Sequence, residues 1–250
     1  MARARRELPP PLPPETRTIG QLVAETIRLY ASRFWPSLAL GVGPAALVVL
    51  STVFRSFWAL TGIAVAAGFV SAAVFVGACV IAKGETPGRR TLLAAYAVAV
   101  VVSLPAPFIP ILWLSLLGLS VPAVVMEGRR GADAFRRGWQ LARADLVHAI
   151  GSVAALFVTG FVLAWVMVIL LRAGSDQSVR ISAGLSSLVI SPGLFLGVAM
   201  LYFDQAARAS KLGPSRERSS NADLHPAVDA DGPGRPDAEV ESRAAARGES

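Results

Sequence analysis

The residues best suited to chemistry are a few charged and aromatic side chains at the edges of long apolar stretches. They are Glu127, Arg136, Arg137, Trp139 and Asp204. At a membrane edge, a carboxylate can pair with an arginine, and an arginine can also bind a lipid phosphate. We favour a structural cluster, in which one of the acids pairs with one of the arginines and Trp139 anchors its helix at the interface. Binding of lipid headgroups by the two arginines is the alternative.

Other kinds of chemistry need residue types that are scarce in this chain. It has two histidines, His148 and His225, and one cysteine, Cys79, which lies within an apolar stretch. This set excludes a His-rich metal site and an intramolecular disulfide, and the sequence has no glycine-rich phosphate loop or nucleophile elbow. The apolar stretches carry no Asp, Glu, Lys, Arg or His at mid-depth, where a charge usually marks an ion path. We therefore expect no catalytic constellation, no metal and no cofactor.

The composition is that of a membrane protein. Hydrophobic residues make up 54% of the chain, charged residues 16%, and the mean hydropathy is +0.54, whereas about 25% charged residues is typical of soluble domains. The net charge of +7 comes from basic residues that flank the apolar stretches rather than from one basic stripe. We therefore expect the lipid bilayer as partner, including anionic lipids, and no nucleic acid.

Length and periodicity predict an all-α fold, a polytopic membrane helix bundle, because about 20 apolar residues cross a bilayer core. The membrane domain covers 18–204. Its about six transmembrane helices are 35–54, 57–82, 91–104, 111–126, 147–171 and 181–203, and two interfacial amphipathic helices are 18–34 and 132–146. Thr18 and Gln21 have the spacing of a capping box.

The segment from 91 to 126 has a second interpretation. Three prolines, Pro105, Pro107 and Pro110, separate its two apolar parts, and the first part has only 14 residues. Two short spans joined at the prolines are the favoured prediction. The alternative is a re-entrant hairpin that turns inside the membrane.

Both ends of the chain are polar. Residues 1–17 form a basic, proline-rich leader, and residues 205–250 consist largely of Ala, Gly, Ser, Pro, Asp and Arg. Segments this poor in apolar residues cannot offset the entropy lost on ordering. We expect a disordered leader and a disordered cytoplasmic tail.

Lysine and arginine alternate between the gaps in a way that predicts the orientation. Of the 24 basic residues, 21 lie in the two ends of the chain, in 83–90 and in 127–146, and three lie in the other gaps. Basic gaps face the cytoplasm, so both termini are predicted there. Only two of the 24 are lysines, and Ala, Gly and Val are abundant, a bias typical of GC-rich bacteria. The predicted location is the bacterial inner (plasma) membrane.

Two further patterns concern packing and organisation. Small residues recur at a spacing of four in the last two spans, at Gly151 and Ala155 and at Gly193 and Gly197, which favours close helix contact. In addition, a shift of 112 residues lays Glu25–Trp35 on 137–147, so that both halves begin with an amphipathic helix followed by a span. This indicates an internal repeat, with chance similarity of two amphipathic helices as the alternative.

Four segments resemble the membrane domain found in some glycerophosphoryl diester phosphodiesterases. They are 18–35 before a span, Pro-Ala-Val-Val-Met-Glu-Gly at 122–128, Ala-Phe-Arg-Arg-Gly-Trp-Gln-Leu at 134–141, and Leu-Tyr-Phe-Asp at 201–204. The resemblance covers about residues 18–208 and departs at Gly138, where Ser is expected, and at Gln205-Ala-Ala. It implies a multi-helix membrane domain without an established chemistry. We expect the catalytic barrel to be absent, because no segment outside the spans is long enough for it.

The function expected from these patterns is that of a non-enzymatic integral membrane protein, a scaffold or membrane-organising component. The alternative is a transporter or export factor for a lipid or small apolar solute. A cavity that opens laterally between spans would favour transport, and a closely packed bundle would favour a scaffold.

Overall fold

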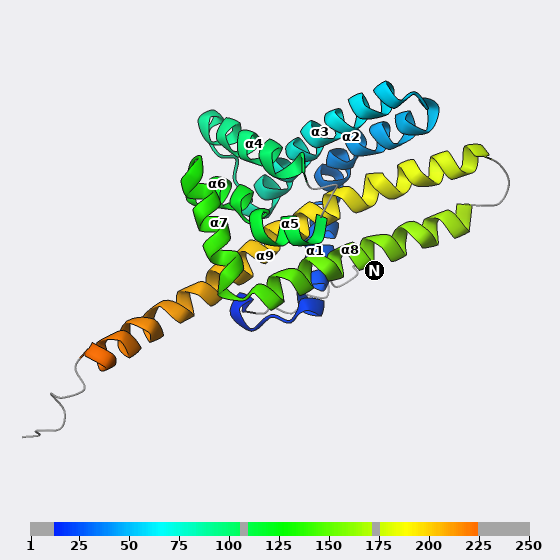
Figure 1. Cartoon of the computed structure of the whole chain (residues 1–250). Coiled ribbons are helices and arrows are strands. Elements are labelled where there is room, and N and C mark those ends of the chain that lie inside the picture. The colour runs from blue at the N-terminus through cyan, green and yellow to red at the C-terminus, as the bar shows by residue number, and fades with distance from the viewer. Residues whose placement is uncertain (1–12, 106–109, 172–175, 225–250) are drawn as a thin grey trace, which may run out of the picture. The chain divides into compact units, whose positions relative to one another are not determined.

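The computed structural model describes residues 13–105, 110–171 and 176–224, and within them it contains helices and no strand. The all-α fold class is therefore confirmed. After a short 3-10 helix, η1 (Pro14–Thr16), the helices follow in chain order (Figure 1): α1 (Ile19–Ser32), α2 (Phe34–Val53), α3 (Phe57–Lys83), α4 (Arg89–Ser103), α5 (Pro110–Leu117), α6 (Ser120–Glu127), α7 (Ala132–Ala144), α8 (Leu146–Leu171) and α9 (Asp176–Leu224).

Five stretches of the described chain are long and apolar enough to cross a membrane. They are α2, α3, the α5–α6 stretch Pro110–Glu127, α8, and Gln177–Lys211 within α9. The predicted span at 91–104 is not among them, so the structure has five such stretches instead of about six. Its helix, α4, has 15 residues. That is about 22 Å at 1.5 Å per residue, whereas a bilayer core is roughly 30 Å thick.

Helix α4 ends near the middle of α3, and α5 returns to contact α4. A Cβ atom built on Gly68 of α3 would lie 2.7 Å from Cδ2 of Leu104, the residue that follows α4. Trp113 of α5 donates a hydrogen bond from Nε1 to the carbonyl of Val102 in α4 at 2.8 Å. The C-terminal end of α4 therefore lies beside the midpoint of α3 instead of beside an end of it. This geometry fits the re-entrant hairpin better than two full spans.

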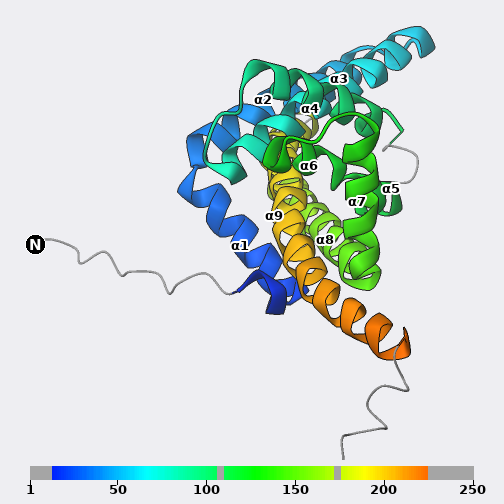
Figure 2. The same cartoon turned by 90° about the vertical axis from the view of Figure 1, so that its left-hand side faces the viewer.

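The long helices form two antiparallel pairs, α2–α3 and α8–α9. The turn between α2 and α3, the C-terminal end of α8 and the N-terminal end of α9 lie at the same end (Figure 1). A Cβ on Gly41 would meet the backbone of Leu188, and one on Gly184 would meet Val49, so α2 lies antiparallel to α9. Helices α4, α6 and α7 gather at the opposite end, which faces the viewer in Figure 2. There α6 packs against α3, α4 and α7, while α5 packs against α7 and α8.

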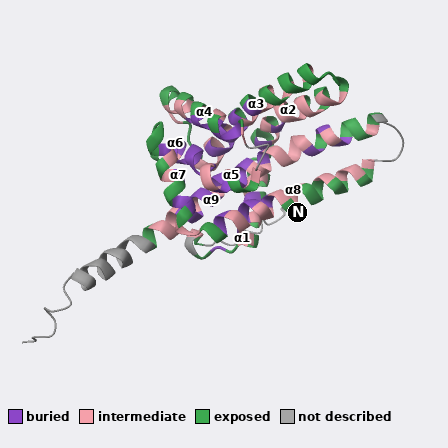
Figure 3. Ribbon diagram, viewed as in Figure 1, coloured by how far each residue is buried: buried purple, intermediate pink, exposed green. Residues whose placement is uncertain are grey.

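Burial divides the bundle along its length (Figure 3). The core lies where the C-terminal half of α3 meets α4, α6 and α9, and the rings of Phe75 and Phe195 stack there with centroids 4.9 Å apart. The opposite ends of the hairpins expose large apolar side chains, such as Phe57 (73%), Trp58 (80%) and Phe161 (64%). Surface of this kind is rare on soluble proteins and is typical of contact with lipid.

Both predicted amphipathic helices are present, but in the second one, α7, a different face is buried from the one expected. In α1, Thr18 and Gln21 form both hydrogen bonds of the capping box. In α7 the buried face is Ala134, Gly138, Leu141 and Ala142, not the predicted face that contains Trp139. Trp139 lies at the edge of that face, 41% exposed, with the guanidinium of Arg143 5.7 Å from its ring centroid.

Helical structure extends beyond the predicted limits of 18 and 204. Residues 14–16 form η1, and α9 continues through 205–224. Arg17, Gln205 and Arg208 contact the bundle, so the predicted disorder does not hold at these three residues. For the rest of 1–17 and 205–250, disorder stays a prediction. Residues 1–12 and 225–250 lie outside the described residues. The chain divides into two compact units, Met1–Ala209 and Ser210–Ser250.

Candidate functional site

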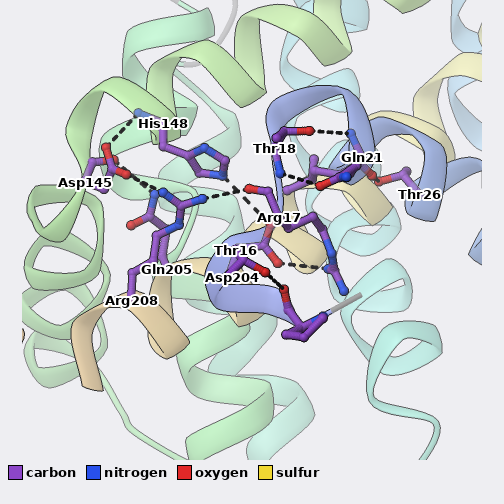
Figure 4. A network of polar contacts seen from close by, with 12 residues as sticks. Thr16, Arg17, Thr18, Gln21, Thr26, Asp145, His148, Asp204, Gln205 and Arg208 are labelled. Carbon is purple, nitrogen blue, oxygen red and sulfur yellow. Dashed lines mark hydrogen bonds and ion pairs between the residues drawn. The ribbon is translucent and has the colours of Figure 1, made fainter. Parts of the chain in front are cut away.

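Two groups of polar side chains surround the C-terminal end of the apolar part of α9. The Asp204 cluster consists of Arg17, Asp145, His148, Asp204, Gln205 and Arg208 (Figure 4). The Glu127 cluster consists of Glu127, Arg129, Arg137 and Tyr202. Each cluster joins α9 to segments that are distant in the sequence.

A buried ion pair forms the centre of the Asp204 cluster. Arg17 Nη1 lies 2.9 Å from Asp204 Oδ1, and the two side chains are only 5% and 0% exposed. Arg17 immediately precedes the capping box of α1, which fixes the backbone at the point where the arginine turns inward. Removing one partner of such a pair leaves an uncompensated buried charge and typically costs about 3–5 kcal/mol. The pair therefore holds the start of α1 to the end of the apolar part of α9.

A second ion pair ties α8 to the same place. Arg208 Nη1 lies 2.5 Å from Asp145 Oδ2, and Arg208 Nη2 donates to the carbonyl of Arg17 at 2.8 Å. Asp145 also caps α8, because its Oδ1 accepts the backbone N–H of His148 at 3.0 Å. Gln205 is fully buried and donates from Nε2 to the carbonyl of Asp145 at 3.1 Å.

The environment of Asp145 favours its ionised form. Partial burial by itself raises the pKa of this carboxyl, but the hydrogen bond from the His148 backbone and the contact with Arg208 outweigh that effect. The pKa of Asp145 is therefore held below its ordinary value. At neutral pH the carboxylate is charged and fully engaged by its neighbours.

His148 of α8 faces the second carboxylate oxygen of Asp204. Its Nε2 lies 3.9 Å from Asp204 Oδ2, and both side chains are buried. This separation is too long for a direct hydrogen bond. The contact is ionic only when the imidazole is protonated. The carboxylate of Asp204 already has a counterion in Arg17.

The Glu127 cluster joins α9 to α6 and α7. Glu127 Oε1 accepts hydrogen bonds from Arg137 Nε at 2.9 Å and from the Tyr202 hydroxyl, and Oε2 accepts from Arg129 Nε at 2.6 Å. One carboxylate at the end of α6 thus holds α7 and α9. The side chains of Glu127 and Arg137 are 25% and 28% exposed, so this ion pair is more exposed to its surroundings than the Arg17–Asp204 pair.

The structure brings together only part of the predicted cluster. Glu127 and Arg137 form an ion pair, but Asp204 pairs with Arg17, which the sequence places in the leader. Arg136 is exposed, and Trp139 lies at the edge of the buried face of α7. Sequence reasoning missed the contributions of Arg17, Asp145, His148, Arg208 and Tyr202. A signal for Arg17 existed, because an acid that ends an apolar span needs a nearby cation.

The predicted packing residues differ in their surroundings. A Cβ on Gly197 would lie 2.4 Å from Leu156 Cδ1, so α8 and α9 are in close contact there. Gly151 lies against Ile19 of α1, and Ala155 is partly buried. A Cβ on Gly193 would have no atom within 4 Å. Gly193 therefore borders an open space instead of a close helix contact.

That open space is a cavity of about 230 Å³ between α1, α8 and α9. Its walls are almost entirely apolar, and its hydroxyl groups belong to Thr26, Tyr30 and Thr159. The two threonines donate to carbonyls of their own helices at 2.8 Å. The Tyr30 hydroxyl is buried and has no hydrogen-bond partner among the described residues. Because that hydroxyl is closed off and the threonines are satisfied, this lining suits an apolar molecule.

Comparison with protein-family models, curated proteins and solved structures finds no match to this chain. The resemblance to the membrane domain of glycerophosphoryl diester phosphodiesterases stays a prediction from the sequence. The departure at Gly138 has a local reason in this fold. A Cβ at Gly138 would lie 2.4 Å from Ser120 Oγ and 2.6 Å from its backbone nitrogen, so α7 approaches α6 too closely for serine.

Proposed function

We propose that this protein is a non-enzymatic scaffold of the bacterial plasma membrane that retains lipid, with both termini in the cytoplasm. The observation that carries the proposal is that the buried charged groups bind each other. Arg17 engages Asp204, and Arg208 engages Asp145. Charged groups that pair with each other in this way hold helices together and are not free to bind a substrate.

The distribution of basic residues supports the proposed orientation. The segments rich in Lys and Arg, namely the leader, 83–90 and 127–146, include or adjoin the two polar clusters. The exposed apolar ends of the hairpins carry few basic residues. Cytoplasmic loops are enriched in Lys and Arg, so we assign the clusters to the cytoplasmic side.

Exposed arginines support the proposed retention of lipid. Arg136 and Arg143 are exposed on α7, and Arg129 is 47% exposed just before it. Arginines at this depth suit phosphate groups, and each basic residue near an anionic leaflet contributes about 1 kcal/mol. We therefore propose anionic phospholipid as the partner of this face.

A transporter is the second candidate, and two cavities between the helices favour it: the one of about 230 Å³ described above and a second that contains hydroxyl groups. A cavity of about 420 Å³ lies between α2, α3 and α9, and its lining includes Ser51, Ser71, Ser187 and Ser191. Serine hydroxyls within a membrane can form hydrogen bonds with a polar solute. However, Ser51 donates to the carbonyl of Val48 at 2.7 Å, and the hydroxyls of Ser187 and Ser191 bond each other at 3.3 Å. The hydroxyls of Ser51, Ser187 and Ser191 therefore already have partners, so we favour the scaffold.

Retention of lipid can be measured by native mass spectrometry of the protein released from nanodiscs of phosphatidylglycerol and phosphatidylcholine. We expect the wild type to keep phosphatidylglycerol preferentially. The double variant Arg136→Ala, Arg143→Ala should lose that preference and keep its thermal stability, because both side chains are exposed. A matched control is Arg55→Ala, which removes an arginine from the turn between α2 and α3, at the end of the bundle away from α7. Equal lipid retention in all three proteins would contradict the proposal.

A further inference from the structure

An open groove of about 560 Å³ lies between α2, α3 and α4. Its lining is apolar apart from the hydroxyl groups of Thr86 and Tyr96. The floor of the groove is the stretch 73–81 of α3, which is about 12 Å long at 1.5 Å per residue. The side chain of Leu93, on the α4 wall, is 70% exposed. The groove is therefore accessible from the surroundings of the bundle.

One end of the groove lies beside the ends of two stretches that are long and apolar enough to cross a membrane. The first, α2, begins at Phe34, and the second, α3, ends at Lys83. Pro36 of α2 and Thr86, in the loop between α3 and α4, line the groove at this end. The apolar part of a span matches the hydrocarbon core of the bilayer, so its ends lie at the depth of the headgroups. The groove therefore runs from headgroup depth toward the middle of the bilayer, where acyl chains are present.

Two exposed arginines lie at this end of the groove. Arg89 is the first residue of α4, and the lining residues Leu92 and Leu93 follow it by three and four positions. Residues at these spacings share one face of a helix, so Arg89 continues the α4 wall of the groove. Arg33 directly precedes α2 and lies three residues before Pro36. Arginines at headgroup depth suit the phosphate group of a lipid.

An exposed acid lies beside these arginines. Glu85 directly precedes the lining residue Thr86 in the loop 84–88. Arg33, Arg89 and Glu85 are all exposed, and the ion pairs of the described residues join other side chains. A groove suited to an acyl chain thus ends at accessible charges of both signs. A zwitterionic phospholipid matches this order, because its phosphate follows the acyl chains and its ammonium group follows the phosphate.

We propose that this groove binds one phospholipid with a phosphoethanolamine headgroup. One acyl chain lies along α3 between α2 and α4, Arg33 and Arg89 bind the phosphate, and Glu85 accepts hydrogen bonds from the ammonium group. Lipid tails are as apolar as the walls of the groove, so the headgroup contacts provide the preference for this lipid. The inference rests on the proposed function in taking lipid as the partner, but it uses a different face from the arginines of α7.

Four variants separate the parts of this site. Ala73 is exposed and lines the groove, so Ala73→Leu places a larger side chain in it. Ala97→Leu is the matched control, because Ala97 is exposed on α4 and lies outside the lining. Glu85→Gln removes the charge that binds the ammonium group and keeps the size of the side chain. Arg89→Ala removes a phosphate-binding group.

The full chain is reconstituted in nanodiscs of phosphatidylethanolamine and phosphatidylglycerol that contain a trace of one of the two lipids with a photoreactive diazirine in an acyl chain. We expect the ethanolamine probe to label the groove-lining peptides of α3 and α4 roughly 2- to 10-fold more than the glycerol probe, as expected for one hydrogen bond. Glu85→Gln should abolish that difference. Arg89→Ala should reduce labelling by both probes, because both lipids carry the phosphate. Ala73→Leu should remove most of the labelling by both probes, and Ala97→Leu should change neither.

Three results would overturn the inference. Equal labelling by the two probes in the wild type, or a difference that Glu85→Gln leaves unchanged, would show that Glu85 does not select the headgroup. Labelling that Ala73→Leu leaves unchanged would show that lipid only surrounds the bundle. Cross-links between two copies of the chain at the groove in place of lipid labelling would make a second copy the occupant.

The same labelling also separates this inference from the proposed function. The double variant Arg136→Ala, Arg143→Ala should leave the labelling of the groove unchanged, because these arginines lie on α7. Loss of the ethanolamine preference in the groove, with phosphatidylglycerol still retained through α7, would refute this inference alone. The reverse result would refute the proposed retention of anionic lipid alone.

Discussion

At the scale of single residues, the stability of this bundle depends on acids that lie in or beside apolar surroundings. Asp204 is fully buried and is matched by Arg17 over a sequence separation of 187 residues. Desolvation makes such a pair a poor source of stability compared with apolar residues, but a broken pair is strongly destabilising. The pair therefore specifies how α1 docks on α9.

Substitution Asp204→Asn should destabilise the protein, because the Arg17 charge stays buried without its counterion. The expected loss is about 3–5 kcal/mol, measured as the free energy of unfolding in mild detergent. Arg136→Ala, at an exposed position, is the control and should change stability by less than about 0.5 kcal/mol. The double variant Arg17→Met, Asp204→Leu should lose less stability than the sum of the losses of Arg17→Met alone and Asp204→Leu alone. Full additivity would show that the two side chains do not interact.

The Asp145 carboxylate should make stability depend on pH at the acidic end. Its pKa is lowered in the folded state, so its contribution is complete above the pKa of an unfolded Asp, about 3.9. That contribution is lost as the pH falls through the lower folded value. The stability difference between wild type and Asp145→Asn should therefore be constant above about pH 5 and shrink below it. A difference that stays the same down to the acid unfolding limit would rule out this linkage.

At the scale of elements, the sequence predicts the long helices well and the contacts between them poorly. Apolar length defines α2, α3 and α8 to within about two residues, and the capping box defines the start of α1. The α4–α5 turn could not be predicted, because 105–110 contains no Lys or Arg and the charge count is the same for a hairpin and for two spans. The role of Arg17 was missed because its partner is 187 residues away.

The re-entrant hairpin can be tested by labelling with an impermeant maleimide on intact cells. The buried Cys79 is first replaced by Ala. Ser56→Cys, in the turn between α2 and α3, should then react. Leu104→Cys should not react, because Leu104 lies beside Gly68 near the middle of α3. Equal labelling of the two positions would mean that α4 and α5 cross the membrane as two full spans.

Two glycines of α9 provide a paired test of helix packing. Gly197→Leu should destabilise the protein by about 1–3 kcal/mol, because its Cβ alone would meet Leu156 at 2.4 Å. Gly193→Leu should be tolerated, because it points into the cavity. Thermal unfolding in detergent measures both. If the two variants were equally stable, the contact between α8 and α9 would differ from the one described.

At the scale of the whole molecule, the described bundle has an apolar end and a polar end. Two long hairpins expose apolar side chains at one end, and the Asp204 and Glu127 clusters tie five separate segments together at the other. This arrangement suits a protein that stays fixed in the bilayer and holds lipid against its surface. A transporter would instead need two arrangements of these helices, and the buried ion pairs oppose such a rearrangement.

The central claim, that the protein holds lipid without moving it across the membrane, is tested most directly by a phospholipid transfer assay. The full chain is reconstituted into liposomes that contain a trace of fluorescent phosphatidylglycerol, and dithionite is added outside to quench the outer leaflet. We predict that about half of the fluorescence stays protected, as in protein-free liposomes, because each leaflet holds about half of the label. Loss of the protected half at a rate that increases with the amount of protein would contradict the scaffold and establish transport.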